Sequence, residues 1–295
     1  MQIIHLRNKT IDYKRWDECI ARSKNHLTYG YSWFLDIVSP DWEALVSNDY
    51  EYVMPLPVKS RYGIPYLVQP VLTQQLGIFS EQNIDEQIVE KFIKQIPYFS
   101  YELNLNEANF CAKALIFPNF ILNLNHPYDQ LIARYSKNTK RNLDKAVKHR
   151  LTVSSGLSAE AFLSFYFSVE KNFLSPKETI LQKLIVKGLS ENALSLFGVY
   201  TENKELIAAL CILNSADRIT YLLPVSNQEG KESSAMFLLI DQIIKDEAGT
   251  NKVLDFEGSR IEGVARLYRG FGAKYHPYYI LKRFRPSFFI GKLPR

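Results

Sequence analysis

Cysteine is scarce in this chain, and histidine is scarce as well. The three cysteines, Cys19, Cys111 and Cys211, are far apart and form no CxxC pair. The five histidines form no metal-ligand or catalytic-triad spacing with them or with each other. A disulfide framework and a zinc site both need closely spaced or paired cysteines. We therefore expect neither a disulfide scaffold nor a bound metal.

Three common catalytic motifs are also missing. The sequence contains no Gly-rich phosphate-binding loop of the Walker type, no dinucleotide-binding glycine pattern and no Gly-x-Ser-x-Gly turn. Those patterns place phosphates, nicotinamide or flavin cofactors, or a nucleophilic serine. Their absence disfavours phosphoryl transfer, hydride transfer and serine hydrolysis.

Long hydrophobic runs are absent too. The longest, near Ala235–Ile244, is interrupted by Asp241, and it is shorter than the roughly 20 apolar residues that cross a bilayer. The first residues lack the apolar stretch of a signal peptide. We expect a soluble, cytoplasmic protein without a transmembrane segment.

The chain is long enough for two domains. It has 295 residues, of which 46% are hydrophobic and 23% charged, a composition typical of globular proteins rather than disordered ones. A polar turn at Asn123–Pro127 follows strand-like Leu115–Leu124. It predicts an N-terminal domain over 1–125 and a C-terminal domain over 126–295.

The second half begins with a helix of unusual charge. A single helix over Tyr128–Arg150 would place an apolar face (Ile132, Tyr135, Leu143, Ala146, Val147) opposite a basic one (Lys137, Arg141, Lys145, Lys148). Residues 134–150 include seven Lys or Arg and one Asp, a local net charge of +6, against +5 for the whole chain. Such a stripe suits nucleic acid, an anionic cofactor or an acidic membrane surface. It is equally typical of an ordinary surface helix.

The rest of this half alternates strands and helices. Three consecutive strands form a meander, and a buried helix, a strand, a short helix and a last strand follow. The ranges are Leu196–Tyr200, Ile207–Asn214, Arg218–Val225, Ser234–Asp246, Lys252–Phe256, Ile261–Phe271 and Tyr278–Phe284.

Two acidic residues near the end of the strand Lys252–Phe256 are candidates for acid–base chemistry. Alternation along an extended chain puts Asp255 and Glu257 on one face. Like charges at that spacing raise one pKa, which a general base near neutrality requires. The alternative is a structural ion pair with Arg266 or Arg269.

The segment Ser226–Ser234 joins a strand to the buried helix. Small polar residues before a helix leave backbone N–H groups at its positive end, where a phosphate binds readily. The alternative is that Ser233 or Ser234 only caps the helix. In the next helix, Arg269 offers a planar fork for a carboxylate or phosphate, or it is an ordinary surface arginine.

These segments together resemble a known family. The order of strands and helices is similar to the GNAT acetyltransferase fold. Segments Ser136–Ala146 and Leu254–Ala273 resemble the FemAB-type proteins, the peptidoglycan-bridge aminoacyltransferases. Pro55–Lys59 and Gln74–Ile78 resemble the first half of uncharacterised bacterial relatives. The resemblance implies an α/β (mixed α+β) chain of two tandem GNAT-like domains, each a mainly antiparallel mixed sheet flanked by helices.

The resemblance also implies transfer of an acyl group to an amine. Coenzyme A users carry an Arg/Gln-x-x-Gly-x-Gly/Ala loop, and here the glycine of Gln228–Ser233 stands one place early. We expect acyl-CoA or a similar thioester as donor, without a metal, and a small-molecule or peptide amine as acceptor. The alternatives are tRNA-dependent aminoacyl transfer and a non-enzymatic RNA or anionic-surface binder. The N-terminal domain would be degenerate.

Roles follow from the same resemblance. Asp255 or Glu257 would take the amine proton, Tyr221 would protonate the leaving group, and Arg269 and Ser259 would bind the acceptor. The donor phosphates would lie on the backbone and side chains of one loop (Gln228, Gly230, Lys231, Ser233, Ser234).

Overall fold

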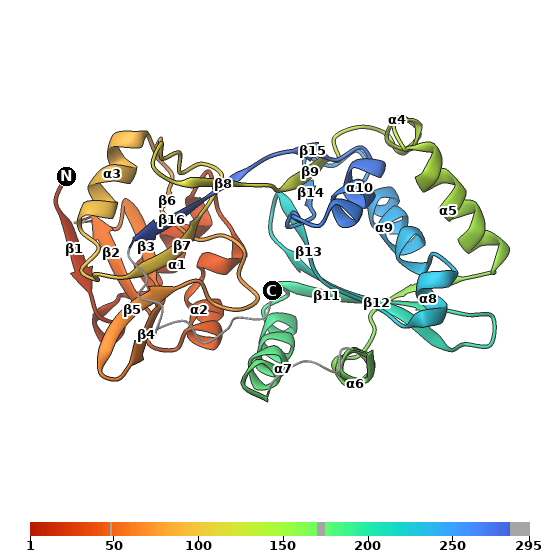
Figure 1. Cartoon of the computed structure of the whole chain (residues 1–295), viewed down its shortest axis with the longest axis horizontal. Helices are drawn as coiled ribbons and strands as arrows, with labels where there is room; N and C mark the ends of the chain where they lie inside the picture. Colours follow the sequence, from red (N-terminus) through yellow and green to blue (C-terminus); the bar gives the residue numbers. More distant parts are fainter. Residues whose placement is uncertain (48, 170–174, 284–295) are drawn as a thin grey trace. The chain divides into compact units, whose positions relative to one another are not determined.

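A computed structural model of the chain describes residues 1–47, 49–169 and 175–283 (Figure 1). The described chain forms two compact units. One consists of Met1–Phe117 and Pro277–Arg295, and the other of Pro118–His276. The sequence places the division between 125 and 126, whereas the compact units divide at 117/118 and exchange the C-terminal segment.

The first unit contains two sheets and three α-helices. Its four-stranded antiparallel sheet has the order β1-β2-β3-β6, with β1 at Ile3–Leu6, β2 at Glu43–Ser47, β3 at Tyr52–Leu56 and β6 at Phe79–Ser80. The helices are α1 (Tyr13–Arg22), α2 (Ser32–Val38) and α3 (Glu86–Lys94), with 3-10 turns η1 (Asn8–Thr10) and η2 (Thr28–Gly30). Asp85 begins α3 by accepting a hydrogen bond from the Ile88 amide at 2.9 Å, the usual role of an N-cap aspartate.

The five-stranded sheet of this unit includes the last strand of the chain. Its order is β4-β5-β7-β16-β8, with β4 at Val58–Arg61, β5 at Ile64–Val68, β7 at Tyr101–Leu105, β16 at Tyr278–Arg283 and β8 at Leu115–Phe117. The predicted strand Tyr278–Phe284 is therefore present up to Arg283, and Phe284 lies outside the described residues. Its assignment to the C-terminal domain was wrong, because β16 forms its ladders with β7 and β8 of the first unit.

The second unit is built on a seven-stranded sheet of order β10-β11-β12-β13-β14-β9-β15. The strands are β10 (Thr152–Ser155), β11 (Leu194–Tyr200), β12 (Leu206–Asn214), β13 (Arg218–Ser226), β14 (Val253–Asp255), β9 (Phe120–Asn123) and β15 (Lys274–Tyr275). Every ladder is antiparallel except that between β13 and β14. The predicted three-stranded meander is thus β11-β12-β13.

Helices flank this sheet. They are α4 (Tyr128–Ala133), α5 (Lys137–Lys148), α6 (Ala159–Val169), α7 (Ser175–Ser190), α8 (Gln228–Glu232), α9 (Ala235–Asp246) and α10 (Glu262–Gly270). The apolar face of α9, including Leu239, Ile240 and Ile243, packs in one core with Leu254 and Phe256 of the strand β14 region. This burial drives the docking of α9 on the sheet.

Two predicted elements are split in the structure. The strand over Leu115–Leu124 breaks into β8 and β9 around Pro118 and Asn119, where proline has no N–H for a ladder. The helix over Tyr128–Arg150 breaks into α4 and α5, because Ser136 caps a new helix by accepting from the Thr139 amide at 3.1 Å.

Candidate functional site

The parallel pair β13 and β14 separates after three residues. Arg218, Ile219 and Thr220 pair with Val253, Leu254 and Asp255. The next residue of β14's segment turns to β9, where the Phe256 amide donates to the Phe120 carbonyl at 3.0 Å. On the side of β13 away from β12, residues 221–226 have no ladder partner among the described strands. Backbone hydrogen-bonding groups are thus available along this edge.

Pro224 fits this open edge. It lies within β13 opposite Leu210 of β12 and its side chain is exposed. Proline cannot donate to a ladder and is confined to positions where its nitrogen faces away from a partner strand. Its place in β13 is consistent with a strand paired only on the β12 side at this level.

The two faces of the β13–β14 pair differ in chemistry. Residues directly opposite across a ladder share a face, so Thr220 and Asp255 lie together, with Arg218 two residues along the same strand. These three are largely buried, with Thr220 exposed to 4% and Asp255 to 2%. The opposite face carries Tyr221 and Phe256, which belong to the apolar core.

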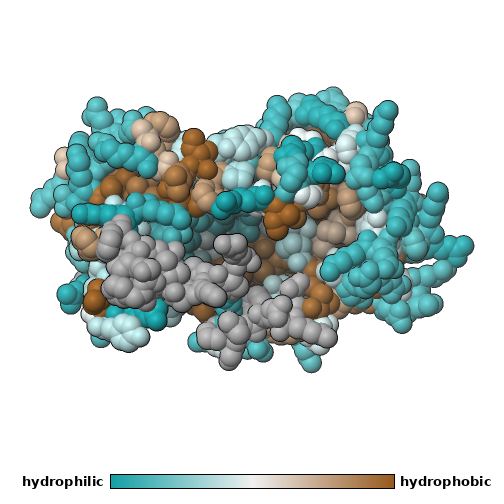
Figure 2. All heavy atoms as spheres, in the orientation of Figure 1, coloured by the Kyte–Doolittle hydropathy of each residue, from teal (hydrophilic) through white to brown (hydrophobic). Residues whose placement is uncertain are grey.

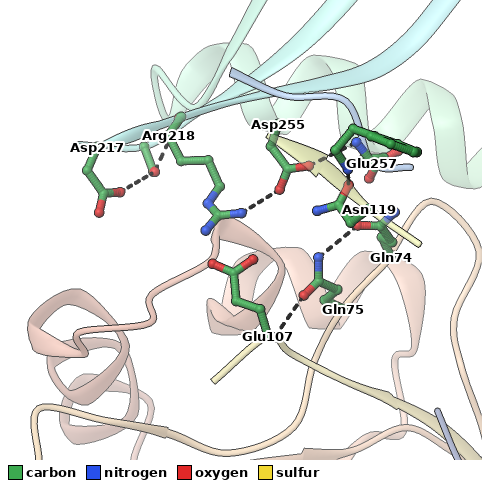
Figure 3. Close-up of polar contacts among 10 residues, drawn as sticks. Gln74, Gln75, Glu107, Asn119, Asp217, Arg218, Asp255 and Glu257 are labelled. Carbon is green, nitrogen blue, oxygen red and sulfur yellow. Dashed lines mark hydrogen bonds and ion pairs between the residues drawn. The ribbon is translucent and has the colours of Figure 1, made fainter. Parts of the chain in front are cut away.

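Asp255 is held by two partners. The Arg218 guanidinium donates through Nη1 to Asp255 Oδ2 at 2.5 Å, and the Glu257 amide donates to Asp255 Oδ1 at 2.9 Å (Figure 3). The predicted alternative, an ion pair with Arg266 or Arg269, named the right kind of interaction with the wrong partner. The parallel pairing that brings Arg218 close is a non-local contact that residue spacing does not reveal. Asp255 therefore has a structural position beneath Glu257.

Glu257 leaves the strand that precedes it. Its φ is +57°, and Gly258 follows with φ +65°, so two successive residues adopt left-handed conformations that suit glycine and cost energy elsewhere. The prediction that Asp255 and Glu257 share one strand face was wrong, because β14 ends at Asp255. A Cβ at Gly258 would lie 2.1 Å from the Pro118 carbonyl oxygen. This close approach requires glycine and fixes Glu257 at the point where β14 leaves β13.

Tyr221 lies in the core rather than beside Asp255. Its ring is 4% exposed and lies 5.7 Å from Phe256 and 6.0 Å from Tyr268, measured between centroids. Burial raises the pKa of Tyr221 well above its usual value. Burial also raises the pKa of Tyr268, and the negative charges of Glu257 and Asp255 add to that shift. The structure thus places Tyr221 and Asp255 on opposite faces.

The predicted phosphate-binding loop is helical. Asn227 caps α8 by accepting from the Gly230 amide at 2.8 Å, and the amides of Lys231, Ser233 and Ser234 donate to carbonyls within the segment. The prediction of an open loop was wrong here, since the asparagine before Gln228 starts a helix one turn earlier. Most backbone donors of the segment are therefore engaged.

The side chains of this segment have local partners. Gln228 donates to Glu232 at 2.6 Å, the Ser233 hydroxyl donates to the Glu229 carbonyl at 2.7 Å, and the Ser234 hydroxyl donates to Asn142 of α5 at 2.8 Å. A Cβ at Gly230 would lie 2.3 Å from the Ile207 carbonyl oxygen. Gly230 thus allows α8 to pack against β12, while Lys231 is exposed.

The substrate-binding candidates lie around α10. Arg269 donates through Nη2 to Glu262 and lies over the Phe120 ring at 5.5 Å. Ser259 accepts from the Ile261 amide at 3.0 Å. Both residues are thus near the end of β9 and the start of α10, and Arg269 remains exposed.

The basic residues of α5 are free of ion pairs. Lys137, Lys145 and Lys148 are exposed and form no ion pair with any residue that the structure describes, and Arg141 donates to the neutral Asn138 side chain at 2.8 Å. The surface over α5 is largely hydrophilic (Figure 2). Val147, predicted to face inward, is 66% exposed, because α5 starts afresh at Ser136 and faces the core with Thr139 and Ala146 instead.

Asn119 was missed by sequence reasoning. It precedes β9 and its side chain is 0% exposed. Its Nδ2 has no hydrogen-bond partner among the described residues, and an unsatisfied buried donor costs about 1–3 kcal/mol. In the sequence, Asn119 reads as a turn residue after a proline, so no local signal marks it.

Two further searches gave nothing. Within the described ranges, no three His, Cys, Asp or Glu side chains are grouped as metal ligands would be. None of the helices that the structure describes has the length and hydropathy needed to cross a bilayer.

Comparison with known proteins shows the fold and no more. No family model matches the sequence, and no curated protein matches it. The structure resembles FemX with a TM-score of 0.65 at 10% identity, over 95% of this chain and 98% of that one. It also resembles a conserved protein of unknown function from Bacteroides thetaiotaomicron (0.60, 8%, 93% and 98%) and L-PGS from Bacillus licheniformis (0.52, 12%, 86% and 88%). The chain therefore has a FemX-like, acyltransferase-type fold, and the predicted mixed α+β class is confirmed.

Proposed function

We propose that this protein is an N-acyltransferase that moves an acyl group from acyl-CoA or a similar thioester to an amine. The observation that carries the proposal is the separation of β13 from β14, with Glu257 at the point of divergence. An extended, amide-containing donor arm pairs with an open strand edge as an added strand would. Residues 221–226 of β13 offer such an edge.

The residues near this edge suit the remaining parts of the donor and acceptor. The segment Gln228–Ser234 follows β13 directly, and exposed Lys231 is its available cation for phosphate. Arg269 and Ser259 lie beyond Glu257 on the chain and would bind the acceptor. Most amides of α8 are engaged, so the donor phosphates would depend on side-chain charge more than on a backbone cradle.

Glu257 is the general base in this proposal. The acceptor amine attacks the acyl carbonyl carbon, the C–N bond forms, and Glu257 takes the amine proton as the C–S bond breaks. Asp255 acts through Glu257, since it accepts from the Glu257 amide and is itself fixed by Arg218. Holding the two reactants in line supplies part of the rate enhancement.

The test is acyl transfer by the full chain with acetyl-CoA and longer acyl-CoA species against a panel of amines and peptides. Glu257→Gln should lower kcat by about 10²–10⁴-fold, the usual effect of losing a general base. Glu247→Gln, which changes a glutamate paired with Lys252 instead, is the matched control. Retained turnover in Glu257→Gln would remove Glu257 from the mechanism.

The unpaired cations of α5 favour a second candidate, tRNA-dependent aminoacyl transfer. A protein that neutralises several phosphates binds more weakly as salt rises. If tRNA is the donor, its affinity should fall with salt and with alanine at Lys137, Arg141, Lys145 and Lys148, and acyl-CoA should not bind. Thermal-shift titration with acyl-CoA and with tRNA at two salt concentrations separates the two donors.

A further inference from the structure

Asn119 presents an oriented hydrogen-bond donor. Its Oδ1 accepts from the Phe120 amide at 2.8 Å, which fixes the carboxamide plane and identifies the other end as the NH₂ group. Its backbone carbonyl accepts from the His276 amide at 2.9 Å. The side chain is thus held at both ends of the residue, while Nδ2 has no partner among the described residues. A donor so fixed awaits an acceptor oxygen.

The position of Asn119 is adjacent to Glu257. In the β9–β14 ladder, Asp255 lies opposite Ile121 and the Phe256 amide bonds to Phe120. Continuing this antiparallel register by one residue sets Glu257 opposite Asn119 (Figure 3). A Cβ at Gly258 would lie 2.7 Å from the Asn119 Cα, which confirms that the two segments touch.

Asn119 also shares a face with Asp255. Alternation along β9 puts residues 119 and 121 on one side of the sheet, and Ile121 is opposite Asp255. The carboxylates of Asp255 and Glu257 are negative, so a neutral N–H donor beside them serves an oxygen that acquires charge during reaction rather than a bound anion. A carbonyl oxygen in acyl transfer is such a group.

We propose that Asn119 Nδ2 donates a hydrogen bond to the carbonyl oxygen of the acyl donor and stabilises it as it becomes an oxyanion. This inference rests on the proposed acyl transfer. The amine nitrogen adds to the carbonyl carbon, electron density moves to the oxygen held by Asn119, and Glu257 takes the proton. Collapse then reforms the C=O bond and expels the thiolate.

Asn119→Ala tests this role. Loss of one oxyanion donor lowers kcat by about 10²–10³-fold, and we expect that fall with a donor KM changed by less than about threefold. Asn123→Ala is the matched control, because Asn123 lies on the same strand and also accepts a backbone amide, from Asn125 at 2.9 Å. It should keep the wild-type kcat. Equal rates in Asn119→Ala and Asn123→Ala overturn the proposal.

A second measurement needs no variant. Infrared difference spectra of the wild-type protein with ¹²C- and ¹³C-carbonyl acetyl-CoA report hydrogen bonding to the carbonyl. We expect its stretch to move to lower frequency than in water-free reference solvent, and to return in Asn119→Ala. An unshifted band in an active wild-type protein overturns the role of Asn119 alone. Failure of the wild-type protein to bind or turn over any acyl-CoA overturns the proposed function, and this inference with it.

Discussion

Asp255 and Tyr221 lie on neighbouring parallel strands yet face opposite sides of the seven-stranded sheet. Asp255 meets Arg218 on the polar face, and Tyr221 meets Phe256 and Tyr268 in the core. Thr220 is the residue of β13 that pairs with Asp255, and its neighbour Tyr221 must point the other way. One residue of register therefore decides which side chains act together.

The Arg218–Asp255 pair should be sensitive to the loss of one partner. We expect Arg218→Met to lower the free energy of unfolding by about 3–5 kcal/mol, because it leaves a buried carboxylate without its cation. The double variant Arg218→Met/Asp255→Leu should lose less than the sum of the single changes. Arg269→Met, which removes the exposed pair with Glu262, should cost about 1 kcal/mol or less. Urea unfolding measures all four, and equal costs for Arg218→Met and Arg269→Met would contradict the prediction.

Tyr221→Phe separates the core role of Tyr221 from its predicted role as an acid. Because the ring faces Phe256 and Tyr268, we expect the variant to keep kcat within about threefold and to change stability by no more than about 1.5 kcal/mol. Steady-state acyl transfer over pH 6 to 9 is the measurement. A drop comparable to that of Glu257→Gln would restore Tyr221 as the leaving-group acid.

Two glycines of α10 should respond in opposite directions to alanine. A Cβ at Gly270 would lie 2.5 Å from the Thr139 hydroxyl of α5, so Gly270→Ala should destabilise by about 1–3 kcal/mol through overpacking. Gly263 has nothing within 4 Å of its Cβ position, and Gly263→Ala should stabilise by up to about 1 kcal/mol through helix propensity. Thermal unfolding of both variants checks the pair, and a destabilised Gly263→Ala would show that α10 is not a simple exposed helix there.

Asp241 should make stability depend on pH. It accepts hydrogen bonds from the Tyr128 and Tyr135 hydroxyls, at 2.9 Å each, and burial raises its pKa. The folded protein therefore holds the proton more tightly than the unfolded chain. The resulting stabilisation is fully present below the unfolded value of about 3.9 and is lost as pH rises through the folded pKa.

Asp241→Asn should remove this dependence. We expect the difference in unfolding free energy between wild type and Asp241→Asn to shift in favour of wild type as pH falls from 7 to 4. Urea unfolding at several pH values measures it, with Asp246→Asn as an exposed substitution on the same helix. A difference that does not change with pH would contradict the predicted titration.

Local elements were the part of this protein that its sequence described best. The meander β11-β12-β13, the helix α9 and the strand β2 follow from apolar periodicity and turn residues, which act over a few residues. Capping asparagine and serine side chains decided the exceptions. Asn227 started α8 inside a predicted loop, and Ser136 started α5 inside a predicted helix.

The sequence by itself determined the residue types available for chemistry, the basic character of α5 and the mixed α+β class, because these depend on composition and short-range pattern. Only the tertiary structure decided that Arg218 is the partner of Asp255, that Glu257 leaves the strand at a left-handed turn, and that the Asn119 donor is buried beside it. It also moved β16 into the sheet of the first unit. These outcomes depend on which distant strands pair and in which register, and backbone pairing between segments more than one hundred residues apart leaves no trace in local spacing.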